Sequence, residues 1–348
     1  MRYLIITICL LALGLALQTC SEDFLDTKPI AMETEESFYS SMNAVEPAVI
    51  ACYSQLSRMR TVDFNFVVGM GSVASDDCEA GGDGSAGDTP DMQALDRLTY
   101  TPRDITTIER IWGFFYKGVY FCNVALEKLP EIAVTDPDAN VELINERVAE
   151  VKFLRALYYF LLSQAYGGVC NVTTPLAPDE LSQPRVTIKE IYEDIIEKDL
   201  KEAIPNLPVR SALDNAGRAS RGAAQALLAK MLLYESSYAL NYPGDARFGN
   251  MTQRWDEALQ YAEEVINSGE YKLLGIDGET FDTYWSPQTN AFRYIFSVDG
   301  DNCQENIFEI QNTNDDWIWV QSTGNALTMF CTSRRIMLPS GAPEQLGW

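Results

Sequence analysis

Apolar residues recur every three or four positions along most of this chain, and this spacing predicts a mainly helical protein. The first predicted helix covers residues 34–56, and Pro47 is expected to kink or divide it. Gly167 and Gly168 follow a long apolar run and are expected to end a helix there. The other predicted helices share this periodicity and cover residues 108–129, 141–166, 187–203, 218–240 and 255–266.

The last two predicted helices carry alanines at helical spacing, which lets two helices approach each other closely. This pairing is similar to the two-helix unit of tetratricopeptide repeats, whose period is about 34 residues. The helix pairs of this chain share no strict period. The sequence therefore predicts divergent tetratricopeptide-like helix pairs joined by long irregular loops.

The texture of the sequence changes beyond Tyr271. Two short runs typical of strands, residues 294–298 and 307–311, alternate there with Gly, Asn, Asp and Pro turns. We therefore expect a mainly α fold with a little β structure near this end.

The first twenty residues have the features of an export signal. Arg2 precedes an apolar run over residues 3–17, which is at best a marginal length for a membrane span and is typical of a secretory signal. Leu17-Gln18-Thr19-Cys20 resembles a bacterial lipobox. Cys20 is then the first residue of the mature protein, with diacylglycerol on its thiol and an acyl chain such as palmitate on its amino group. The alternative is simple secretion, in which Cys20 is an ordinary residue.

The charge of the chain excludes one class of partner. Fifty acidic residues against 26 basic ones give a formal net charge of −24. So acidic a protein repels phosphates, which excludes nucleic acid as a partner. A hydrophobic fraction of 47% is too high for a disordered acidic chain, so a folded domain is expected.

The chain contains no histidine. Ser-His-Asp and Cys-His catalysis are therefore excluded, as are zinc sites that need imidazole. The eight cysteines form no Cys-x-x-Cys pair, and Cys52 and Cys122 are expected to be small buried side chains in helices. Residues 299–310 begin like a calcium loop but fail the EF-hand pattern, and we expect neither a metal nor a cofactor.

Several stretches, taken in order, resemble the SusD/RagB family of Bacteroidetes outer-membrane nutrient-binding lipoproteins. The first is Cys20-Ser-Glu-Asp-Phe-Leu-Asp-Thr-Lys-Pro29, and the most recognisable is Phe153-Leu-Arg-Ala-Leu-Tyr-Tyr-Phe160 with Tyr166-Gly-Gly168 behind it. The other matching stretches are residues 121–125, 191–208, 217–230 and 305–310.

The resemblance implies residues 1–19 as a signal peptide, 20–33 as a lipidated tether and 34–348 as a SusD-like helical domain. It implies a protein anchored on the outside of the outer membrane that is not an enzyme. Such a protein binds a nutrient, here a glycan or oligosaccharide, and delivers it to a SusC-type TonB-dependent porin. Family members normally continue beyond residue 348, so the resemblance also implies that a C-terminal part of the domain is missing.

Aromatic residues in loops are the candidate ligand contacts. Tyr284 and Trp285 precede Ser-Pro, and Trp317 and Trp319 follow Asn314-Asp-Asp316. Exposed Tyr and Trp faces stack on sugar rings. The alternative is that these side chains are strand or core residues, as the alternation of Trp317 and Trp319 allows.

Two other functions stay open at this stage. An exported glycan hydrolase needs only two carboxylates, although Asp76/Asp77 and Asp315/Asp316 lie in polar stretches typical of a solvated surface. A helical-repeat scaffold that binds only proteins is the other alternative. Glu150 and Arg155, inside an apolar helix, are expected either to have a partner or to extend the charged end of the side chain to solvent.

Overall fold

The computed structural model describes residues 34–57, 71–81, 90–101, 106–213, 215–276, 278–283 and 286–311. The described secondary-structure elements, in chain order, are α2 (Glu35–Phe38), η2 (Met42–Ala44), α3 (Val45–Ser57), α4 (Pro90–Asp96), α5 (Thr106–Thr135), α6 (Val141–Tyr166), α7 (Ile188–Ile191), η5 (Tyr192–Glu197), α8 (Lys198–Ala203), η6 (Arg210–Ala212), α9 (Arg221–Asn241), α10 (Trp255–Ile266), β1 (Thr280–Thr283), β2 (Ser286–Asn290), α11 (Ala291–Ile295) and η7 (Val298–Gly300).

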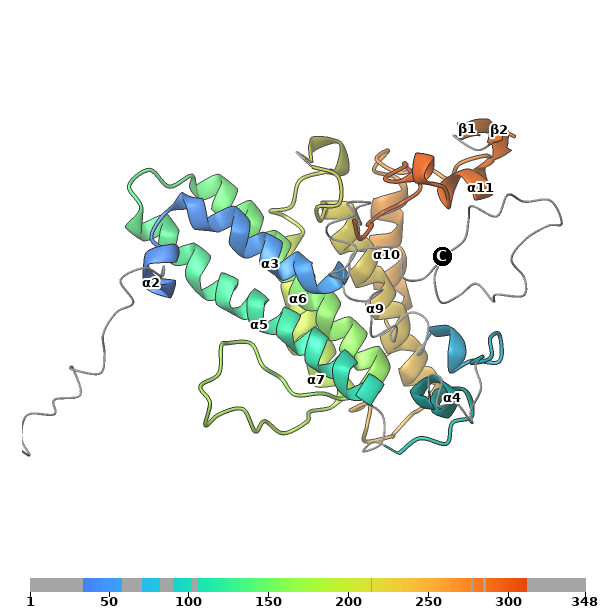
Figure 1. Ribbon diagram of the computed structural model, residues 1–348, viewed down its shortest axis with the longest axis horizontal. Coiled ribbons are helices and arrows are strands. Elements are labelled where there is room, and N and C mark those ends of the chain that lie inside the picture. Colours follow the sequence, from blue (N-terminus) through green and yellow to red (C-terminus); the bar gives the residue numbers. More distant parts are fainter. Residues whose placement is uncertain are drawn as a thin grey trace, which may run out of the picture.

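Two groups of helices form the body of the protein. Helices α3, α5 and α6 lie side by side, and the pair α9 and α10 packs beside them (Figure 1). Helix α8 lies between the groups, since it contacts both α6 and α9. The strands β1 and β2 form a small antiparallel hairpin at the edge of the helical body. The predicted fold class, mainly α with paired helices and a little β, is confirmed.

The ends of the helices are set by local hydrogen bonds. Asn140 caps α6, because its Oδ1 accepts a hydrogen bond from the backbone N–H of Leu143 at 3.1 Å. Gly167 ends the same helix with a φ of +72°, which glycine adopts without strain. At the start of α7, Thr187 and Glu190 form a capping box.

The core lies where α6 is surrounded by the other helices. Helix α6 is buried on more than one side, which explains why its sequence lacks a polar stripe. Its largest buried side chains, all with almost no exposed surface, are Phe153, Tyr158, Tyr159 and Phe160.

Most predicted helices are confirmed within a few residues. The predicted first helix is divided into α2, η2 and α3, and Pro47 lies in the first turn of α3, where its missing N–H leaves no bond unmade. Residues 187–203 form one helical stretch whose middle part, η5, is a π-helix.

Two predictions for the end of the described chain are wrong. Residues 294–298, expected as a strand, form the end of α11 and the start of η7, because Asn290 caps a helix through the N–H of Arg293. Residues 307–311 form no strand: Ile307 lies in a bend, and the residues after it have no regular secondary structure and pair with no described strand. The hairpin lies instead at the polar residues of β1 and β2, where the hydrophobic pattern gives no signal.

Individual burial predictions also have mixed outcomes. Cys52 and Cys122 are fully buried free thiols, as expected. Tyr159 and Trp255 lie in predicted helices, and we expect both side chains to take part in helix packing. Tyr159 is buried as expected, but Trp255 is 40% exposed, so the expectation for Trp255 is wrong. None of the described helices is long and apolar enough to cross a membrane.

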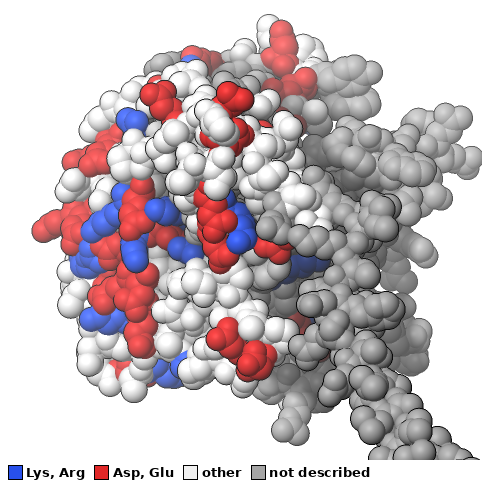
Figure 2. Space-filling model, turned by 90° about the vertical axis from the view of Figure 1, so that its left-hand side faces the viewer, with Lys and Arg blue, Asp and Glu red and all other residues white. Residues whose placement is uncertain are grey.

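Charged side chains of both signs share the surface. Figure 2 shows one face of the molecule, on which Lys and Arg side chains lie among the Asp and Glu side chains. Several ion pairs of this kind are short, such as Lys152 Nζ to Glu202 Oε2 at 2.6 Å. Although the sequence is strongly acidic, some of its surface carboxylates are therefore paired with basic side chains.

Gly118 of α5 allows the close packing of α5 against α6. A Cβ atom at this position would lie 2.5 Å from Cζ of Tyr158. That ring cannot move aside easily, because it is fully buried and its hydroxyl donates to the carbonyl oxygen of Cys52 at 2.7 Å.

We therefore expect Gly118→Ala to destabilise the protein. Overpacking costs about 1–3 kcal/mol, against at most about 1 kcal/mol gained from the helix propensity of alanine. Gly113→Ala in the same helix is the control, because a Cβ there meets nothing within 4 Å. Urea unfolding should show a loss for Gly118→Ala and no loss for Gly113→Ala. Equal stabilities for the two variants would contradict this packing.

Candidate functional site

The candidate site is a groove between α3, the segment before α9 and the last described residues. It encloses about 390 Å³. One wall is apolar and comes from Ile50, Tyr53 and Leu56 of α3, while Phe308 and Ile310 face them from the other side. A second cavity of about 210 Å³ shares Arg218, Phe308 and Glu309 with the groove and adds Arg210, Asn302 and Asn306.

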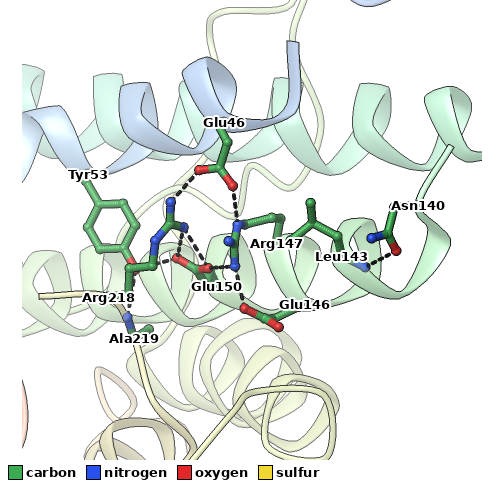
Figure 3. Close-up of polar contacts among 9 residues, drawn as sticks. All are labelled: Glu46, Tyr53, Asn140, Leu143, Glu146, Arg147, Glu150, Arg218 and Ala219. Atoms are coloured by element: carbon green, nitrogen blue, oxygen red, sulfur yellow. Dashed lines mark hydrogen bonds and ion pairs between the residues drawn. The ribbon is translucent and has the colours of Figure 1, made fainter. Parts of the chain in front are cut away.

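Two arginines and two glutamates form a ring of hydrogen bonds (Figure 3), and the ring adjoins the groove because Arg218 is part of both. Arg147 donates to Glu46 and to Glu150, both at 2.7 Å. Arg218 donates to Glu150 at 2.9 Å and also to Glu46. Each carboxylate therefore accepts hydrogen bonds from both guanidinium groups, and the ring joins α3, α6 and the segment before α9.

Tyr53 connects this ring to the groove. Its hydroxyl donates to Glu150 Oε2 at 2.9 Å and accepts the backbone N–H of Ala219 at 2.8 Å. Only 1% of Glu150 and 3% of Arg147 is exposed, so these charges would be very unfavourable without partners. The ring fixes the position of Arg218 at the edge of the groove.

The pKa values of the two carboxyl groups of the ring are shifted in opposite directions. Burial raises the pKa of Glu150, although Arg218 and Arg147 act in the opposite direction. Glu46 is also partly desolvated, but hydrogen bonds from Arg147 and Arg218 outweigh this and lower its pKa. Since both groups are held by guanidinium groups, the ring acts as a fixed support rather than as a pair of free acids.

A second buried charge pair holds the segment after α6. Arg155 makes a two-point contact with Asp199, at 2.7 and 2.8 Å, and also donates to Asn123 Oδ1 at 2.9 Å. Asn123 in turn donates to the carbonyl oxygen of Val172 at 3.0 Å. The Tyr159 hydroxyl donates to the same carbonyl at 2.7 Å. Helix side chains thus fix residues 172–174 without a regular strand.

The ligand residues predicted from the sequence lie outside the described residues. This holds for Tyr284, Trp285, Trp317 and Trp319, and for the predicted lipidation site Cys20. Their roles stay predictions. The expectation that Glu150 and Arg155 have partners is confirmed. Sequence reasoning did not find Glu46 or Asp199 as those partners, because nothing local in the sequence links positions so far apart.

Comparison with known proteins assigns the chain to a family. The SusD-like family model described as "Starch-binding associating with outer membrane" matches residues 23–233. The chain belongs to the SusD-like family. SusD-like protein P25 of Formosa agariphila is 23% identical over 269 residues, 75% of this chain and 46% of the relative. A SusD-like protein of Bacteroides ovatus is 25% identical over 301 residues, 86% of this chain and 48% of the relative.

Solved structures agree with this assignment. A laminarin binding SusD-like protein is similar at a TM-score of 0.56 and 32% identity, over 68% of this chain and 47% of that one. Surface glycan-binding protein A of Bacteroides uniformis, at 20% identity and a TM-score of 0.58, supports the fold alone, over 76% of this chain and 51% of that one. The chain therefore spans about half the length of these relatives.

We expect Glu150→Gln to destabilise the protein strongly. It leaves Arg147 and Arg218 with an amide in place of their shared buried carboxylate. Breaking a buried pair from one side costs about 3–5 kcal/mol. Urea unfolding, followed by circular dichroism, measures the loss.

The matched control is Asp245→Asn, the same change in an exposed pair, where Asp245 contacts Arg247 at 2.6 Å. That variant should unfold at the urea concentration of the unmodified protein, since exposed pairs contribute little. If Glu150→Gln were as stable as Asp245→Asn, the ring would not be an important support.

Proposed function

We propose that this SusD-like protein is a lipoprotein of the cell surface that binds a glycan and delivers it to a SusC-type TonB-dependent porin. The family description supports association with the outer membrane. The observation that carries the proposal is the similarity to a laminarin binding SusD-like protein at 32% identity. Laminarin is therefore the first glycan to test.

The described part of the molecule favours capture of a ligand over cleavage. Its buried carboxylates Glu150, Asp199 and Glu235 each contact a guanidinium group. A glycoside hydrolase needs one carboxyl group that donates a proton and a second that acts on the sugar or on water. A carboxylate that is already paired with a guanidinium group is poorly suited to either task.

The experiment is incubation of the protein with a panel of polysaccharides that includes laminarin. Affinity electrophoresis measures retention, and chromatography of the supernatant measures release of shorter sugars. The proposal predicts retention without release. Release of oligosaccharides would support an exported hydrolase, and absence of both would support a scaffold that binds only proteins.

We expect loop tryptophans to carry the affinity for the glycan. Replacement of Trp285 or Trp317 by Ala should weaken binding about 30-fold, because an aromatic hot spot contributes about 2 kcal/mol and each tenfold corresponds to about 1.4 kcal/mol. Trp255→Ala is the control, since this side chain is partly exposed on α10. Isothermal titration on laminarin measures all three variants. Unchanged affinity in Trp285→Ala and Trp317→Ala would remove these residues from the binding site.

We expect Cys20→Ala to release the protein from the membrane while the helical body stays folded. The reason is that acyl chains on this residue would be the anchor, and two or more chains are needed for stable attachment. Membrane fractionation is done in cells that lack the porin partner. Continued co-fractionation of Cys20→Ala with the outer membrane would contradict the anchor.

A further inference from the structure

A cleft of about 300 Å³ lies where the first turn of α9 meets the end of α10. It shares no lining residue with the groove of the candidate site, although Arg210 also borders the second cavity beside that groove. Two of its lining residues are arginines, Arg210 and Arg221. Its other lining residues are Val209, Gly222, Gln225, Glu264, Asn267, Ser268, Glu270 and Tyr271.

The guanidinium group of Arg221 has no hydrogen-bond partner among the described residues, and its Nε is buried from solvent. Arg210 donates only to backbone carbonyls, those of Asn302 at 2.6 Å and Cys303 at 3.0 Å. Other buried or half-buried arginines of this protein contact carboxylates, as Arg155 and Arg254 do. A buried donor without an acceptor is unfavourable, so the Nε of Arg221 can take an acceptor that does not belong to the described residues.

The glutamates of the cleft are already engaged with other groups. Glu270 accepts the backbone N–H of Ser211 at 2.7 Å and the Ser211 hydroxyl at 2.9 Å. Glu264 accepts hydrogen bonds from the amides of Gln225, at 2.7 Å, and Gln260, at 3.1 Å. All four carboxylate oxygens therefore have a donor, and none of these donors is an arginine.

Tyr271, which also lines the cleft, is held in place by its neighbours. The Tyr271 hydroxyl is 2.8 Å from the hydroxyl of Ser220, and the guanidinium carbon of Arg210 lies 5.8 Å from the centre of the Tyr271 ring. The same ring packs on Gly222, where a Cβ atom would lie 2.5 Å from its Cε2. A tyrosine ring, the side-chain amide of Asn267 and the unpaired Nε of Arg221 line one cleft, and groups of these kinds contact sugar rings that carry a charged substituent.

We propose that this cleft binds an anionic substituent of a glycan, the carboxylate of a uronic acid or a sulfate ester, through Arg221 with Arg210 beside it. Both substituents offer the oxygen pairs that a guanidinium fork recognises. The positive end of the helix dipole at the start of α9 adds to the attraction. The link to a glycan rests on the proposed function, whereas the anion site itself does not.

The test is a titration of the full chain with glucuronate and with inorganic sulfate, and with glucose as the neutral counterpart of glucuronate. The Nε–H signal of Arg221 in a nitrogen–proton correlation spectrum reports on the orphan donor directly. We expect glucuronate or sulfate to shift this signal and glucose to leave it unchanged. Comparison of the glucuronate and sulfate titrations shows which anion the cleft prefers. No shift with either anion would overturn the proposal.

Arg221→Gln should weaken binding of the preferred anion at least tenfold. Arg293→Gln is the control, because it changes the net charge equally and Arg293 is exposed on α11, outside the cleft. Arg221→Lys keeps the charge without the fork and should bind with intermediate affinity, which keeps the test valid if Arg221→Gln folds poorly. Equal affinities of a folded Arg221→Gln, measured by its melting curve, and Arg293→Gln would contradict the assignment.

The two proposals fail separately. Retention of laminarin without any response to anions would leave the glycan-binding function standing and remove the cleft. A shift of the Arg221 signal without retention of any polysaccharide would keep the anion site and remove the glycan function.

Discussion

The structure depends on the pairing of charges inside an otherwise apolar helix. Arg155 points from the middle of α6 into the core, where 9% of the residue is exposed, and such a charge is tolerated only with a well-placed partner. Asp199 of α8 supplies that partner through two hydrogen bonds. Because both side chains are buried, the relative position of α6 and α8 is restricted to the one that keeps them in contact.

The same constraint organises the surroundings of the groove. The ring of Glu46, Arg147, Glu150 and Arg218 links α3 and α6 to the segment before α9. Tyr53, which lines the groove, is held by hydrogen bonds to Glu150 and to the backbone of Ala219. In the helical body formed in this way, the buried arginines Arg147 and Arg155 are paired with carboxylates. In contrast, the Nε of Arg221 has no acceptor among the described residues, and this difference is the basis for assigning a ligand to it rather than a supporting role.

The sequence was sufficient for the helices because their periodicity and capping residues act locally. The bounds 141–166 and 255–266 were predicted from apolar spacing and agree with α6 and α10. The partners of the buried ion pairs could not be predicted from the sequence, since residues such as Glu46 and Arg218 are brought together only by tertiary folding. The hairpin β1–β2 was missed because its residues are polar, and residues 294–298 were misread because Asn290 supplies a helix cap that overrides their strand propensity. For the site, the sequence indicates the aromatic residues Tyr284, Trp285, Trp317 and Trp319, which lie outside the described residues. The described cavities are lined instead by residues far apart in the sequence, such as Arg218 and Phe308, which only the tertiary fold brings together.

The most direct test of this account is a double-mutant cycle on Arg155 and Asp199. Arg155→Met and Asp199→Leu should each lower the free energy of unfolding by about 3–5 kcal/mol, because each leaves one buried charge without its partner. The double variant should lose much less than the sum, with an interaction free energy of at least about 2 kcal/mol, because no unpaired charge remains. Additive losses in urea unfolding would contradict the central claim that buried charge pairing holds the helices in place.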